Sequence, residues 1–210
     1  IKDFCQLTAE KKLDGILCTV WDDCSVHLET VWRGLYDFAL FSWNYEDIPA
    51  EKAHALFRHR FFSPFLAPAV NEFQDSLETA LSFWDTALVI GGDRENYHKD
   101  FKLLELPDIS DPGSWTVRNS GRLQQAALNV RRYDTIKSRI SRSMQLAERN
   151  VYALSVMYRI NELQVYPAKL LLLLETFDKA TAAGKNAAAA KLLDYVNTFG
   201  DIRAQLEKVF

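Results

Sequence analysis

A short apolar segment that runs into acidic residues and then into a helical pattern constrains the fold most. Residues 15–20 read Gly-Ile-Leu-Cys-Thr-Val, a run typical of a strand covered on both faces. Trp21, Asp22 and Asp23 follow where this run stops. Over residues 29–43 apolar side chains recur at helical spacing, which predicts an amphipathic helix. In a (β/α) barrel the site residues lie at the ends of strands that lead into helices, and a strand that ends in carboxylates and an indole fits this arrangement.

The rest of the chain has the apolar periodicity of helices. It predicts the end of a helix in residues 1–14 with Gly15 as its stop, helices over 50–60 and 68–90, one long or two nearly continuous helices over 120–162, and helices after Pro167 and over 186–210. Residues 91–117, which are rich in Pro, Gly and Asp, are expected to be irregular.

These elements predict a mainly α fold. We expect a helical bundle or hairpin array, led by a β-strand–α-helix remnant of a (β/α)8 barrel. The predicted domains are residues 1–44, the last strand and helix of a barrel catalytic domain, and residues 45–210, a C-terminal helical domain. The first residue is Ile1 rather than Met, from which we expect an N-terminal part of the protein to be missing.

Composition excludes several classes of function. The formal net charge of −3 argues against a nucleic-acid-binding module, which would carry a strong positive excess. No apolar run approaches the about 18 residues that a membrane span requires. The three cysteines are an odd number and, like the scattered histidines, lack metal-ligand spacing, so no metal or other cofactor is predicted. The basic stretch over residues 118–149 is interpreted as a solvated or intramolecularly paired helix face.

The residues at the end of the predicted strand are the best candidate site. The Trp21 indole is suited to stack on the apolar face of a sugar ring, and a carboxylate accepts hydrogen bonds from two hydroxyls. The alternative is that Asp22 or Asp23 caps the following helix. Glu29 and Arg33, which form an i, i+4, i+8 ladder with Asp37, are candidates for bracing the site, although such ladders are usually structural.

No catalytic residue is predicted in the chain. A nucleophile elbow, a glycine-rich phosphate loop and paired carboxylates of suitable spacing are all missing from the sequence. Asp22 and Asp23 are adjacent, so in a strand their side chains point to opposite faces. They therefore do not form the pair of carboxylates that flanks the scissile bond in a glycosidase.

These residues resemble one known family. The run over residues 15–23, then Glu29-Thr-Val-Trp-Arg-Gly and Phe41-Ser-Trp-Asn, is similar to the last barrel strand and helix of family 20 glycoside hydrolases, the β-N-acetylhexosaminidases and their bacterial relatives. The family strand typically ends Trp-Gly-Glu, whereas here Asp22 replaces the glycine and Asp23 is one methylene shorter than the glutamate. The resemblance covers about residues 13–44, and the helical remainder resembles C-terminal extensions of some bacterial members.

The resemblance implies a substrate-binding role. Trp21 would form a wall of the pocket for a terminal N-acetylhexosamine, and Asp23 would bind its hydroxyls. Asp22, Glu29 and Arg33 would support these two side chains without contacting the sugar. The catalytic Asp-Glu pair of the family, which supports a substrate-assisted mechanism, would lie N-terminal to Ile1, so this chain alone is not expected to be active.

Further expectations follow from the resemblance. The partners would be the carbohydrate substrate, through the full-length enzyme, and the missing N-terminal barrel, with a homo-oligomer as a further option. The sequence leaves the location unknown, and the resemblance is compatible with a periplasmic or secreted protein. A different class, a non-catalytic helical interaction or scaffold module, is the alternative.

Overall fold

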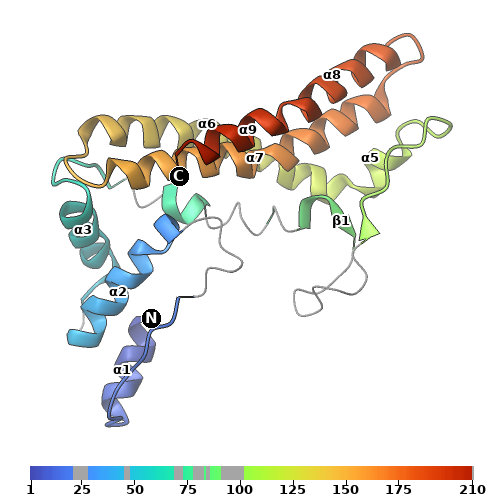
Figure 1. The fold of residues 1–210 in the computed structure, drawn as a ribbon. Coiled ribbons are helices and arrows are strands. Elements are labelled where there is room, and N and C mark those ends of the chain that lie inside the picture. Colours follow the sequence, from blue (N-terminus) through green and yellow to red (C-terminus); the bar gives the residue numbers. More distant parts are fainter. Residues whose placement is uncertain are drawn as a thin grey trace. The chain divides into compact units, whose positions relative to one another are not determined.

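The structure is a computed structural model that describes residues 1–20, 28–44, 48–68, 73–77, 83, 86–90 and 102–209. It is mainly helical, as the periodicity predicts, and its elements are drawn in Figure 1. The chain forms two compact units. Unit 1 comprises residues 1–74 and 139–158, and unit 2 comprises residues 75–138 and 159–210. The domain assignment to 1–44 and 45–210 stays a prediction.

Short helices with a common core make up much of the described part of unit 1. They are α1 (Lys2–Glu10), α2 (Trp32–Trp43) and α3 (Ala50–Phe61), and the 3-10 turn η1 (Leu28–Thr30) precedes α2. The buried side chains of Cys5, Phe41 and Ala53, one from each helix, form a small apolar cluster. On α3 the buried Phe57 stacks on Phe61 at a centroid distance of 4.9 Å. The helices predicted over 29–43 and 50–60 are therefore confirmed, the first starting later than expected.

The first helix ends differently from the prediction. Lys12 adopts a left-handed backbone conformation, with φ of 54°, and the Leu13 amide donates to the Thr8 carbonyl oxygen at 3.1 Å. This hydrogen bond closes the helix end in the way that a C-terminal glycine usually does. Gly15 was thus wrongly predicted as the stop, because a lysine accepts the strained position three residues earlier.

The strand predicted over residues 15–20 is not formed in the described part of the chain. This segment has no regular secondary structure, and the Leu17 side chain is 83% exposed. Burial nevertheless alternates along it: Ile16 packs against the Cys5 cluster and Cys18 is half-buried, while Leu17 and Thr19 are exposed. The physical reason for the difference is that a strand needs a hydrogen-bonded neighbour, and none of the described residues supplies one.

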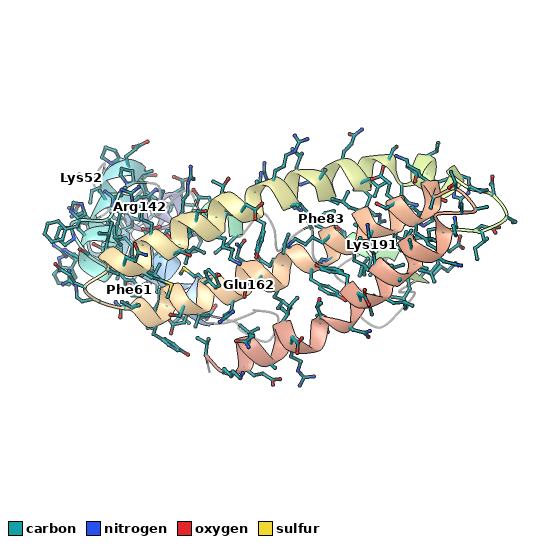
Figure 2. All side chains as sticks on the ribbon, turned by 90° about the horizontal axis from the view of Figure 1, so that it is seen from above. Lys52, Phe61, Phe83, Arg142, Glu162 and Lys191 are labelled. Carbon is teal, nitrogen blue, oxygen red and sulfur yellow. The ribbon has the colours of Figure 1, made fainter. Side chains whose placement is uncertain are left out.

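Unit 2 is built on long helices. It contains parts of α6 (Ser120–Leu146) and α7 (Val151–Lys179), together with α8 (Lys185–Asn197) and α9 (Phe199–Glu207). Within this unit α7 lies between α6 and the α8–α9 pair (Figures 1 and 2). The core cluster comprises Phe83, Ala87, Trp115, Leu123, Ala126, Ala168, Leu171 and Leu174.

Two predictions for this region are corrected. The helix α7 continues through Pro167 instead of starting after it, because buried residues on both sides, such as Tyr166 and Ala168, hold the helix in the core at the cost of about 3 kcal/mol for an internal proline. The segment expected to be irregular contains regular structure: β2 (Lys102–Leu103) pairs antiparallel with β1 (Val89–Ile90), and α5 covers Ser114–Arg118.

Candidate functional site

The three central candidates of the sequence, Trp21, Asp22 and Asp23, lie outside the described residues. Their immediate neighbours on both sides are described. The irregular segment 15–20 leads toward them from α1, and η1 and α2 follow them. Whether Asp22 or Asp23 binds a sugar or caps the helix therefore stays a prediction.

The bracing candidates lie on the helix that follows. Glu29 is in η1, and Arg33 and Asp37 are on α2. Burial raises the pKa of the Asp37 carboxyl above its ordinary value, and the positive charges of His54 and Arg33 offset part of this effect. The structure thus brings Arg33 and Asp37 together with His54 of α3. Asp37 Oδ1 is buried and has no hydrogen-bond partner among the described residues.

A cleft of about 260 Å³ in unit 2 gathers a second set of polar and aromatic side chains. Tyr133 of α6 lies on one side, and Glu162 and Lys169 of α7 on another. Tyr195 of α8 and Gln205 of α9 also line it. All of these side chains belong to unit 2. We call this group the α6–α7–α9 cleft.

The acidic group of the cleft is neutralised by two cations. Glu162 Oε2 accepts a hydrogen bond from Arg159 Nη1 at 2.7 Å, and Glu162 Oε1 accepts one from Lys137 Nζ at 3.2 Å. Figure 2 labels Glu162 on α7. Lys137 also donates to the Tyr133 hydroxyl at 3.1 Å, so the four groups form one network. A carboxylate shared in this way keeps acceptor capacity, since its two oxygens offer about four lone-pair positions.

Lys169 has a different environment from the other two cations. Its ammonium lies over the Tyr133 ring, 4.4 Å from the ring centroid, which is a cation–π contact. It has no hydrogen-bond acceptor among the described residues. Burial lowers the pKa of Lys169, an effect that Asp134 opposes, Lys137 adds to and Glu162 opposes. The cleft therefore contains a half-buried positive charge whose donors are available.

The far wall of the cleft is a rigid aromatic stack. Tyr195 stacks on Tyr166 with ring centroids 4.9 Å apart, and Phe199 packs on Tyr166 at the same distance. The Tyr195 hydroxyl donates to the Tyr166 carbonyl oxygen at 3.2 Å. Burial raises the pKa of the Tyr195 phenol well above its ordinary value, helped by Tyr166 and Tyr133, so this wall stays neutral across the physiological range.

The described residues offer neither a metal-binding cluster nor a membrane-spanning helix. No group of three or more His, Cys, Asp or Glu side chains in the described ranges is arranged to hold a metal ion. None of the helices in that part of the chain contains a stretch long and apolar enough to cross a bilayer.

Comparisons with known proteins leave the family open. The chain matches no protein-family model, and no curated protein or solved structure is significantly similar to it.

The sequence interpretation missed the α6–α7–α9 cleft. One signal was available: Lys169 is a single cation beside the apolar run Leu170–Leu174, in a stretch whose periodicity indicates a buried helix. Such a lysine needs either a route to solvent or a partner. Its position over Tyr133, in a cleft that Gln205 also lines, depends on the packing of α6, α7, α8 and α9, which the periodicity of the sequence does not predict.

Proposed function

We propose that this chain is the C-terminal part of a family 20-like exo-acting glycoside hydrolase that acts on terminal N-acetylhexosamine-type sugars. In the whole enzyme Trp21 would form a wall of the substrate pocket and Asp23 would bind sugar hydroxyls, while the helical remainder supports the barrel. The observation that carries the proposal is the resemblance of residues 13–44, with Trp21 and Asp23 at the matching positions.

The local structure around the motif supports this proposal. The side chain of Ile16 packs against the core of unit 1, whereas that of the next residue, Leu17, is exposed. A segment with this alternation turns one face toward the packed helices, as a half-buried strand does. Helix α2 then follows and packs on α1 and α3, as the last helix of a barrel packs beside its neighbours.

The roles of Trp21 and Asp23 can be tested in the full-length product of the gene. Trp21→Ala and Asp23→Asn should each lower kcat/KM for a chromogenic N-acetyl-β-hexosaminide by about tenfold or more, because each loses roughly 1.4 kcal/mol or more of sugar contact. Trp21→Phe, which keeps an aromatic face, should lose less. Asp194→Asn, at an exposed position of α8, is the matched control and should be neutral. Unchanged kinetics in both site variants would reject the assignment.

A helical interaction module without catalysis is the second candidate. It is favoured by a set of exposed apolar side chains before and on α5 in unit 2, namely Leu103, Leu106, Ile109 and Val117. Exposed apolar patches are typical of protein contact sites. The two candidates differ in the enzyme assay, because an interaction module gives no hydrolysis in the full-length product.

A further inference from the structure

We infer that the α6–α7–α9 cleft binds a small hydroxylated carboxylate of the sugar-acid class, with its carboxylate on Lys169 and its hydroxyls on the polar groups of the opposite wall. This site is separate from Trp21 and Asp23, and the inference does not rest on the proposed function. It rests on the charges, the available hydrogen-bonding groups and the volume of the cleft.

The charge arrangement selects an anion. Glu162 accepts from Arg159 and Lys137 at 2.7 and 3.2 Å, so the negative charge of its carboxylate is already paired. Lys169 is left over the Tyr133 ring without an acceptor among the described residues, at a half-buried position where an ammonium interacts strongly with a negative group. A ligand carboxylate supplies that acceptor. It also offsets the effect of burial, which lowers the pKa of Lys169.

The remaining polar groups of the cleft favour a ligand that carries hydroxyl groups. The Gln205 amide makes no hydrogen bond to any described residue, so both its donor and its acceptor are available. Asp201, an exposed carboxylate on α9, adds a further acceptor on the same wall. A simple aromatic or aliphatic acid would leave these groups without partners. A polyhydroxylated acid gives them hydrogen-bond donors.

The size and walls of the cleft select a single small ring. Its volume of about 260 Å³ lies below the range of roughly 300–1,000 Å³ that drug-sized ligands occupy. Val165 of α7 and Ile202 of α9 add apolar surface beside the Tyr195 ring. Such a lining suits the apolar C–H face of one pyranose unit.

Isothermal titration of the 210-residue chain with three probes tests this inference. D-glucuronate is the sugar acid, D-glucose is the same ring without the carboxylate, and benzoate is a carboxylate without hydroxyls. We expect D-glucuronate to bind with a Kd at least about tenfold below that of either other probe, and to weaken as salt is raised. No measurable binding of D-glucuronate, or benzoate binding as tightly, would overturn the inference.

Matched lysine variants locate the binding. Lys169→Gln should weaken D-glucuronate binding about tenfold or more, and Lys169→Arg should retain part of it, because the charge is kept. Lys191→Gln removes an exposed lysine on α8, outside the cleft, and should leave the Kd unchanged (Figure 2). Circular dichroism confirms folding of each variant, and Gln205→Ala provides a second test that leaves Lys169 intact. Equal Kd values in the wild type, Lys169→Gln and Gln205→Ala would overturn the inference.

Discussion

Asp178, close to the C-terminal end of α7, accepts two hydrogen bonds from Thr116, which lies 62 positions earlier in the chain. Thr116 N donates at 2.8 Å and Thr116 Oγ1 at 2.7 Å to the same oxygen, Asp178 Oδ2. Thr116 is the third residue of α5, so the carboxylate caps the N-terminus of that helix from a distant element. The Asp178 side chain is fully buried, with 0% exposure. This contact therefore joins α5 to the core of unit 2.

Removing the Asp178 carboxylate should destabilise the chain. Asp178→Ala leaves the partly buried amide and hydroxyl of Thr116 without their acceptor, and we expect the free energy of unfolding to fall by about 2–3 kcal/mol. Urea unfolding followed by circular dichroism measures this. Asp194→Ala, at an exposed position on α8, is the control and should change stability by less than about 0.5 kcal/mol. A similar loss in both variants would contradict the capping role.

The same contact predicts a dependence of stability on pH. Burial raises the pKa of Asp178, but the hydrogen bonds from Thr116 and the charge of Lys185 outweigh this and hold the pKa below its ordinary value. The stabilisation is therefore present above the carboxyl pKa of about 3.9 in the unfolded chain, and is lost as pH falls through the folded value. The difference in unfolding free energy between wild type and Asp178→Asn should be largest near neutral pH and shrink in acid. A difference that is equal at both would contradict this.

Arg122 is predicted to stabilise the backbone that leads into β1. Its Nη1 donates to the carbonyl oxygens of Thr86 and Ala87, both at 2.5 Å, and its Nη2 to that of Val89 at 3.0 Å. A lysine offers a single ammonium and does not reproduce this fork. Arg122→Lys should therefore lower the free energy of unfolding by about 1–3 kcal/mol. Arg131→Lys, at an exposed position of the same helix, should be neutral, and an equal effect of the two would argue against the contact.

The turn between α6 and α7 supplies a prediction with a graded pair of variants. Asn150 has a left-handed backbone, with φ of 51°, and its Nδ2 donates to the Phe61 carbonyl oxygen at 2.7 Å. Asn150→Gly loses the hydrogen bond but tolerates the backbone, whereas Asn150→Ala also adds about 1–2 kcal/mol of backbone strain. Thermal unfolding should rank wild type above Gly and Gly above Ala. An alanine variant as stable as the glycine variant would contradict the strained geometry.

The helices that the sequence predicts well are those whose apolar spacing is matched by local packing. Helix α3 begins at Ala50 and ends at Phe61, within a residue of the predicted bounds, because Ala53 and Phe57 bury one face. Local rules failed at two positions. Pro167 remains inside α7 among buried neighbours, and Lys12 takes the left-handed position expected of a glycine.

Of the two candidate sites, one could be predicted from the sequence and the other depends on tertiary packing. Trp21 and Asp23 were selected by a contiguous motif, a form of evidence that a sequence contains by itself. The α6–α7–α9 cleft combines side chains that are far apart in the chain, such as Tyr133, Lys169 and Gln205. For the basic stretch over residues 118–149, intramolecular pairing was predicted. Lys137 does pair with the carboxylate of Glu162, while Arg122 and Arg149 bind backbone carbonyl oxygens within the chain.

The measurement that tests the central proposal most directly is hydrolysis of chromogenic N-acetyl-β-hexosaminides by two samples in parallel. One is the 210-residue chain and the other is the full-length product of its gene. The proposal predicts activity in the full-length product and none in the 210-residue chain, because the catalytic Asp-Glu pair would lie upstream of Ile1. Absence of hydrolysis in both samples would contradict it and favour a helical interaction module.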